Sequence, residues 1–122
     1  MASKTEPRSG LVWGWTYGEN GWNQGMDANL LRMGRFGFHL SIKDRDLTAP
    51  PASPAEGDTY IVGASATGAW QGYDNHVAVW VPGTPSGQWI FASPRIGWVA
   101  YIEDEEKLSA YKAAGWSVGI SI

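Results

Sequence analysis

The residue types that most often carry catalysis or bind metals are few and scattered in this sequence. The 122 residues include two histidines, His39 and His76, and no cysteine. A zinc site needs several Cys, His or carboxylate ligands at short spacings, and neither histidine has such neighbours. The lack of cysteine also excludes disulfides and thiol chemistry. We therefore predict no metal site and no cofactor.

Two clusters of acidic residues resemble metal-binding or catalytic sites, but neither fits the pattern of such a site. Asp44 and Asp46 flank Arg45, and four acidic residues run together at 103–106. The first group lacks the remaining ligands and the glycine of a calcium loop, which favours a solvated, salt-bridged turn. Adjacent carboxylates repel each other, so the second group is typical of an exposed turn and not of a glycosidase pair. With no nucleophile elbow and no P-loop, the sequence predicts no enzyme and no catalytic residue.

Charge and hydropathy argue against further functional classes of protein. The formal net charge is −3, and the nine basic residues form no cluster that would neutralise nucleic-acid phosphates. No apolar run approaches the roughly 20 residues of a membrane helix. The segment 1–10 is polar and lacks the apolar core of a signal peptide. We expect no nucleic-acid partner, no membrane insertion, and synthesis in a cytoplasm followed by assembly.

The aromatic content is high for a chain of this length. Eight Trp, five Tyr and three Phe accompany sixteen Gly and seven Pro, a composition typical of short strands joined by tight turns. Burying eight indoles in so small a core is difficult. Some Trp side chains are therefore expected at an interface or binding face, where aromatics are enriched. Small chains without disulfides also often depend on oligomerisation.

Residues 1–40 are predicted to form an arm, a short strand and an amphipathic helix that serve docking and oligomerisation. Large apolar side chains alternate over 11–17, the period of a strand. They either cover the core of their own subunit or dock on a partner. A helix is predicted from about Gly21 to Phe36, with Asn20 or Asn23 as N-cap, and it packs on its own sheet or joins a bundle between subunits.

One face of this helix is expected to be apolar and the other polar. The polar side carries Asp27, Asn29, Arg32 and Arg35, whereas the apolar residues recur at spacings of four, four and three. The apolar face and the aromatic strand together make up the predicted assembly interface: Trp13, Trp15, Tyr17, Trp22, Met26, Leu30 and Met33.

The remaining chain is predicted to be a Pro-rich connection, 41–58, followed by an antiparallel β-domain, 59–122. Trp70, Trp80, Trp89 and Trp98 are spaced by nine or ten residues, as expected for indoles stacked across neighbouring strands. The fold class is thus mainly β with one N-terminal helix: a small, Trp-rich antiparallel meander of sandwich or barrel type. The candidate strands are Thr59–Gly63, His76–Val81, Gln88–Ala92, Trp98–Glu103, Leu108–Ala113 and Trp116–Ile120.

A loop of the β-domain has side chains suited to a ligand. Aromatic rings can stack on the apolar faces of sugars, and Asp or Asn side chains can bind hydroxyl groups. The residues of this candidate ligand-facing loop are Trp70, Tyr73, Asp74 and Asn75.

An ordered series of sequence blocks resembles a known family. The main blocks are Thr16-Tyr17-Gly18-Glu19-Asn20-Gly21-Trp22, Lys43-Asp44-Arg45-Asp46-Leu47-Thr48-Ala49-Pro50-Pro51, Gly57-Asp58-Thr59-Tyr60-Ile61-Val62 and Tyr101-Ile102-Glu103-Asp104-Glu105. Together they resemble uncharacterised domains of tail and tail-fibre proteins from tailed phages, prophages and gene-transfer agents, over about residues 13–118.

The resemblance implies a virion structural protein of the tail, baseplate or tail fibre, involved in assembly and host attachment. Its implied partners are further copies of itself, as a homotrimer, other tail proteins, and a host-surface glycan or protein. It implies no catalytic residue. The alternative is a receptor- or carbohydrate-binding module at a fibre tip.

Overall fold

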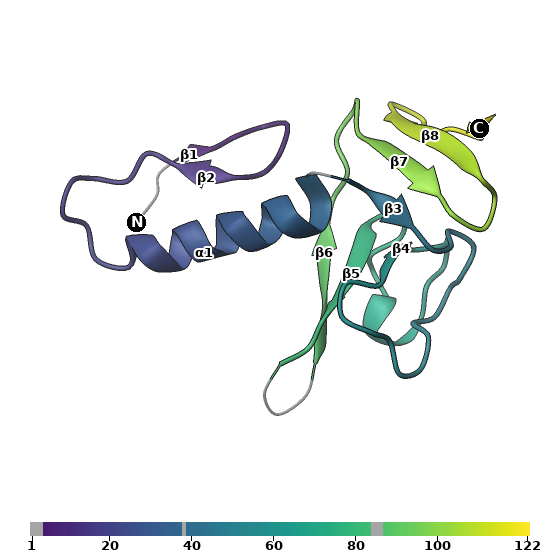
Figure 1. The fold of residues 1–122 in the computed structure, drawn as a ribbon, viewed down its shortest axis with the longest axis horizontal. Helices are drawn as coiled ribbons and strands as arrows, with labels where there is room; N and C mark the ends of the chain where they lie inside the picture. Colours follow the sequence, from purple (N-terminus) through teal and green to yellow (C-terminus); the bar gives the residue numbers. More distant parts are fainter. Residues whose placement is uncertain (1–3, 38, 84–86) are drawn as a thin grey trace. The chain divides into compact units, whose positions relative to one another are not determined.

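The structure is a computed structural model that describes residues 4–37, 39–83 and 87–122. Within these ranges it is mainly β, with ten short strands in three sheets and one α-helix near the N-terminus (Figure 1). The predicted fold class is confirmed. The chain divides into an N-terminal unit, Met1–His39, and a C-terminal unit, Leu40–Ile122. None of the described helices has the length and apolar character needed to cross a membrane.

The N-terminal unit consists of a hairpin and a helix that lie side by side (Figure 1). Strands β1 (Lys4–Thr5) and β2 (Val12–Trp13) pair antiparallel. Helix α1 (Trp22–Arg32) continues into a π-helical turn, η1 (Met33–Gly37), so the helical backbone ends one residue beyond the predicted Phe36.

The predicted asparagine cap of α1 is wrong. The N-cap residue is Gly21, whose φ of 80° is left-handed, and no side chain caps the helix. Glycine adopts this conformation without the steric cost that a Cβ would add. The chain therefore enters the helix through a backbone turn, in which the Gln24 N–H donates to the Gly21 carbonyl at 3.1 Å.

The predicted polar side of the helix is also corrected, because Asn29 is buried. Its side-chain oxygen accepts from the Val12 N–H at 2.9 Å, and its amide group donates to the Val12 carbonyl at 2.8 Å. The Arg32 Nε likewise donates to the Ser9 carbonyl at 2.6 Å. Some backbone groups of the hairpin have no partner within the hairpin and face the helix. Such groups need polar partners when the helix buries them. Asn29 and Arg32 supply them, while Trp22 and Leu30 stay exposed.

We expect Asn29→Ala to loosen the N-terminal unit by about 2 kcal/mol, because both backbone groups of Val12 lose their side-chain partner. Hydrogen exchange of the Val12 amide in the full chain measures the effect and should accelerate roughly 30-fold. Asn23→Ala, on an exposed part of the same helix, is the matched control. Equal exchange rates in the two variants would contradict the bridging role of Asn29.

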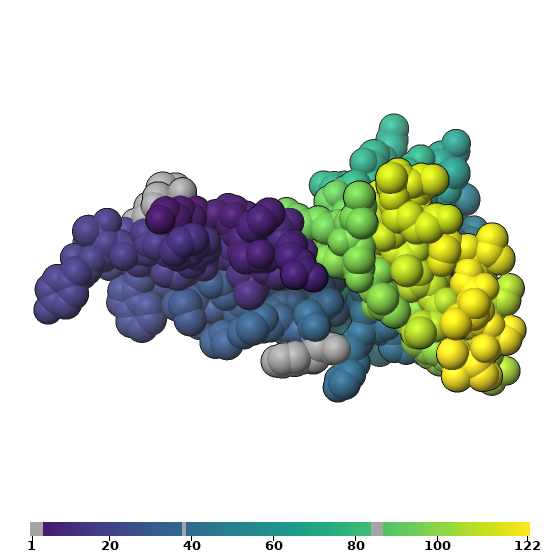
Figure 2. All heavy atoms as spheres, turned by 90° about the horizontal axis from the view of Figure 1, so that it is seen from above, coloured from purple at the N-terminus to yellow at the C-terminus, as the bar shows by residue number. Residues whose placement is uncertain are grey.

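The C-terminal unit contains two sheets. The first is an antiparallel meander of β4 (Thr59–Ile61), β5 (Val77–Val81) and β6 (Gln88–Ala92). The second has the order β10-β8-β7-β3, with β9 paired to β8, and its C-terminal strands lie at the molecular surface (yellow in Figure 2). The strands of the second sheet are β3 (Ser41–Ile42), β7 (Val99–Ile102), β8 (Lys107–Lys112), β9 (Gly115–Trp116) and β10 (Ile120–Ser121).

Strand β3 joins the two sheets. It pairs parallel with β7, whereas every other described strand pair is antiparallel. Just beyond β3, the Lys43 N–H donates to the Thr59 carbonyl at 2.8 Å, and the Ile61 N–H donates to the Asp44 carbonyl at 3.2 Å. The start of the predicted Pro-rich connection thus pairs with both sheets. The predicted strand Trp116–Ile120 is instead divided between β9 and β10, because Gly119 has a φ of 95°.

The core of the C-terminal unit is built around Trp70, which is fully buried on a 3₁₀ turn, η2 (Gly68–Trp70). Its ring centroid lies 5.6 Å from that of Tyr60 and 5.2 Å from that of Trp89. Trp89 pairs across the sheet with Trp80, also at 5.2 Å. Trp80 and Trp89 are thus cross-strand neighbours as predicted, but their rings meet edge to face at 65° and do not stack. Trp70 joins them from a turn, and Trp98 precedes β7 in the other sheet.

Candidate functional site

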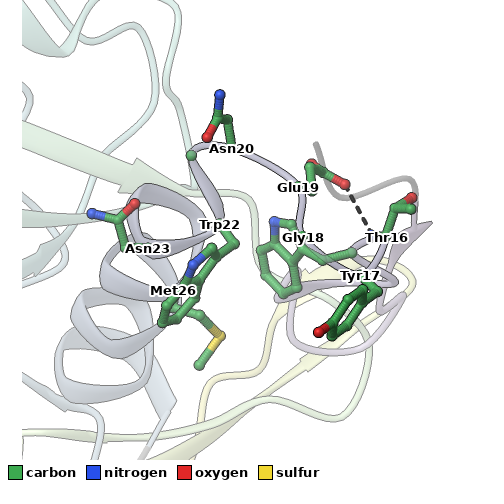
Figure 3. A pocket seen from close by; sticks show the side chains of 10 residues that line it. Thr16, Tyr17, Gly18, Glu19, Asn20, Trp22, Asn23 and Met26 are labelled. Carbon is green, nitrogen blue, oxygen red and sulfur yellow. Dashed lines mark hydrogen bonds between the residues drawn. The ribbon is translucent and has the colours of Figure 1, made fainter.

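The N-terminal unit carries an open hollow of about 600 Å³ beside the start of α1 (Figure 3). The loop after β2 forms one wall, and the first turns of the helix form the other. Three aromatic side chains and one thioether contribute to the lining, together with six polar residues or glycines. We call this feature the aromatic hollow; its principal residues are Trp15, Tyr17, Trp22 and Met26.

Glycines allow the two walls to approach. A Cβ at Gly25 would collide with the Trp15 indole, so only glycine lets this ring lie against the helix. In the loop, the Thr16 N–H donates to the Glu19 carboxylate at 2.9 Å, and the Glu19 N–H returns a bond to the Thr16 carbonyl at 3.0 Å. This reciprocal turn holds the intervening Tyr17 at the tip of the loop.

The side chains around the hollow are unusually exposed for their type. Tyr17 is fully exposed, and Trp22 is 56% exposed. Single exposed apolar residues are common on protein surfaces, but clustered aromatics mark interaction sites. Nearby, Trp13 is 52% exposed and carries the Lys4 ammonium 4.4 Å from its ring centroid. The surface is suited to anchoring a partner through aromatic contacts.

The structure brings four of the seven predicted interface residues together: Trp15, Tyr17, Trp22 and Met26 line the hollow. Trp13 lies on β2, outside the lining. Leu30 is exposed one turn beyond Met26 along α1, and Met33 is half-buried at the start of the π-helical turn. Sequence reasoning thus identified the residue types, although helical periodicity alone did not show which of them share one surface.

The residues of the candidate ligand-facing loop mainly contact other residues of the C-terminal unit. Trp70 belongs to the core, and the Tyr73 ring stacks on Phe91 at a centroid distance of 3.7 Å and an angle of 4°. The Asn75 carbonyl accepts from the Trp116 indole N–H at 3.0 Å.

The carboxylate of this loop, Asp74, is also engaged. It accepts from the Ser65 N–H at 2.8 Å and the Ala66 N–H at 3.1 Å. These two hydrogen bonds stabilise the charged form and lower the pKa of Asp74. The carboxylate therefore fixes the turn that leads into Trp70.

The acidic segments meet in the folded chain. Oxygens of Asp44, Asp46 and Asp104 lie within 4.8 Å of one another. Partial burial, followed by repulsion from Asp44, raises the pKa of Asp104. Exposed acidic groups of this kind are common in proteins without a bound ion, so the three carboxylates alone do not assign a metal site.

Arg45 does not form the predicted salt bridges with its neighbours. Its guanidinium pairs in bidentate fashion with Glu105, Nη2 to Oε1 at 2.8 Å and Nε to Oε2 at 2.9 Å. It also donates to the Ser117 carbonyl at 2.8 Å and the Val118 carbonyl at 2.7 Å. The expected solvated turn is corrected: Arg45 is a largely buried link between three segments, and its planar donor fork binds the carboxylate and carbonyls of residues distant in the sequence.

A model of the family described as "Protein of unknown function (DUF2793)" matches residues 26–117. The chain belongs to this family. No curated protein matches it. The matched region of the DUF2793 family includes the whole parallel pairing of β3 with β7 and the Arg45–Glu105 link. It begins at Met26, so the loop that forms one wall of the aromatic hollow precedes it.

Proposed function

We propose that the chain is a structural protein of a bacteriophage virion, a component of the tail, baseplate or tail fibre, made in the host cytoplasm and incorporated through the aromatic hollow. The observation that carries the proposal is the fully exposed Tyr17 beside the half-exposed Trp22, at the mouth of a hollow that a partner side chain can fill. The resemblance of the sequence blocks to tail-protein domains supports the proposed location in a phage tail.

The physical argument is the cost of leaving such a surface in water. Burying an aromatic side chain of this size contributes about 1.5–3 kcal/mol, and Tyr and Trp are the residues most often found at interface hot spots. The partners we propose are other tail proteins and further copies of the chain in a homotrimer. No catalytic residue is assigned.

A tagged copy of the chain, expressed during phage production, directly tests whether the chain is a component of the virion. We expect it in purified particles, and its absence from them would overturn the proposal. Light scattering of the purified chain tests the homotrimer: the mass should be three times the chain mass of 13.3 kDa, or a whole-number multiple of that trimer mass where trimers associate further.

The double variant Tyr17→Ala, Trp22→Ala tests the hollow itself. We expect incorporation into particles to fall at least tenfold, because two anchor side chains are lost, while the thermal unfolding of the chain hardly changes. Ile96→Ala, which truncates a 69% exposed side chain of the C-terminal unit, is the control and should leave incorporation unchanged. Equal incorporation of both variants would exclude the hollow as the assembly site.

The alternative is receptor or carbohydrate binding by the same hollow, which its exposed aromatic faces favour. Sugar recognition also needs polar groups beside the aromatic ring. Figure 3 shows the side chains of Asn20 and Asn23 pointing away from Tyr17. Binding of the purified chain to a glycan array, lost in the double variant, would favour this alternative over assembly.

A further inference from the structure

The five-stranded sheet of the C-terminal unit has one buried and one exposed face. Side chains alternate between the faces along each strand. Ala100, Ile102 and Ser109 point inward and are at most 1% exposed. Their neighbours Val99 and Leu108 point outward and are 50% and 37% exposed. The outer face of an antiparallel sheet is normally polar when water covers it, so this apolar face needs an explanation.

The exposed side chains form one continuous strip across three strands. Leu108 on β8 lies directly opposite both Tyr101 on β7 and Ile120 on β10. Val99 is two residues before Tyr101 and therefore on the same face. Ile120 is 66% exposed, and Ile122, which continues the alternation, is 77% exposed. We call these five side chains the outer strip.

Charges of opposite sign mark the two ends of the outer strip. Lys112 is the last residue of β8 and shares the outward phase of Leu108. Glu103 follows β7 at the opposite end, in the outward phase of Tyr101. The Ser41 hydroxyl donates to the Glu103 carboxylate at 2.7 Å and holds it on this face. The strip is therefore apolar in the middle, positive at one end and negative at the other.

This arrangement is complementary to itself. If a second copy is turned by a two-fold axis perpendicular to the strands, its strip covers the first strip with the ends exchanged. Lys112 of each copy then faces Glu103 of the other, and Leu108 and Ile120 pack in the centre. Face-to-face sheets of this kind bury side chains in a layer about 10 Å thick.

We propose that the outer strip is a two-fold self-association surface, whose occupant is the outer strip of a second copy of this chain. It is separate from the aromatic hollow, which lies in the other unit. A chain bearing both surfaces can build assemblies larger than either interface alone would form.

Zero-length carbodiimide cross-linking is the decisive experiment. Within one chain, Lys112 and Glu103 lie at opposite ends of antiparallel strands, too far apart for a direct amide bond. The experiment mixes ¹⁴N- and ¹⁵N-labelled full chains in the Tyr17→Ala, Trp22→Ala background, which removes the hollow. We expect a Lys112–Glu103 cross-link in the dimer band with mixed isotopes.

Light scattering of the same variant should give a dimer that dissociates on dilution. Ile120→Lys should weaken the dimer at least tenfold without altering the circular dichroism spectrum. Lys112→Glu should weaken it similarly, and adding Glu103→Lys should restore it, since the charges are then exchanged. A monomer at every concentration overturns the proposal. Failure here leaves the particle test of the hollow unaffected.

Discussion

Replacing Arg45 with methionine should destabilise the C-terminal unit by about 3 kcal/mol. The substitution keeps much of the side-chain volume but removes every hydrogen bond that the guanidinium makes. It leaves the Glu105 carboxylate, 22% exposed, without its cation, and the Val118 carbonyl without its donor, whereas the Ser117 carbonyl keeps the hydrogen bond from the Ser109 hydroxyl. Removing one partner of a largely buried ion pair typically costs about 3–5 kcal/mol, and the partial exposure places this case at the lower end.

Urea unfolding followed by circular dichroism measures the change. Arg45→Lys keeps the charge but not the planar fork, so we expect an intermediate loss. The control is Lys43→Met, two residues away, which breaks the exposed ion pair between Lys43 and Asp58 at 3.3 Å and should change stability little. Equal midpoints for Arg45→Met and Lys43→Met would show that the link contributes nothing beyond a surface pair.

The same link predicts how stability depends on pH. Hydrogen bonding to Arg45 lowers the pKa of Glu105 below its ordinary value of 4.5. A carboxyl group with a lower pKa in the folded state stabilises the fold above the unfolded pKa, and this contribution is lost as the pH falls through the folded pKa. The wild-type chain should therefore lose stability below about pH 4.5, and Arg45→Met should lack that part of the decline. Parallel pH profiles for the two proteins would contradict this assignment.

Trp70→Ala should destabilise the C-terminal unit by about 4 kcal/mol, since it opens a large cavity among Tyr60, Trp89 and the surrounding core. Trp70→Phe should cost clearly less. Among the residues that the structure describes, the buried indole Nε1 of Trp70 has no hydrogen-bond partner, so phenylalanine loses packing but no hydrogen bond.

The midpoints of chemical denaturation are compared for Trp70→Ala, Trp70→Phe and Trp22→Ala. Trp22 is an indole of the same size but is more than half exposed, so its truncation should shift the midpoint little. If Trp22→Ala were as destabilising as Trp70→Ala, the division between a core indole and a surface indole would be wrong.

The fold class followed from the sequence because its signals are local. Apolar and β-branched residues between turn signals located β5 and β6 to within one residue. The parallel pairing of β3 could not be predicted in this way, since Ser41 and Ile42 form a strand only through partners at 101 and 102. The same reason hid the partner of Arg45, which lies 60 residues away, whereas two carboxylates stand next to it in the sequence.

Residue type predicted the aromatic hollow better than periodicity did. The pattern of Trp22, Met26 and Leu30 indicates a buried helical face, yet Asn29 is the buried residue, because the covered hairpin offers backbone groups and not an apolar surface. The sequence predicts Trp70 both among the stacked indoles and in the candidate ligand-facing loop, and no sequence signal shows that the turn at 68–70 points into the core. The close contact between Gly25 and the Trp15 indole was not predicted either, although a glycine inside a predicted helix can indicate that another group packs closely against the helix.

The pairing of β3 with β7 determines the order in which the C-terminal unit can be completed during synthesis. The meander β4–β5–β6 needs only residues 59–92, all close in sequence. Strand β3 and Arg45 leave the ribosome earlier but must wait for residues 101–118, and closing a loop of that length costs about 3–4 kcal/mol of chain entropy. The first strand of the unit is thus among the last to be fixed. Until then the edge of β3 that pairs with β7 stays unpaired, and this edge is the part of the nascent chain most exposed to mispairing.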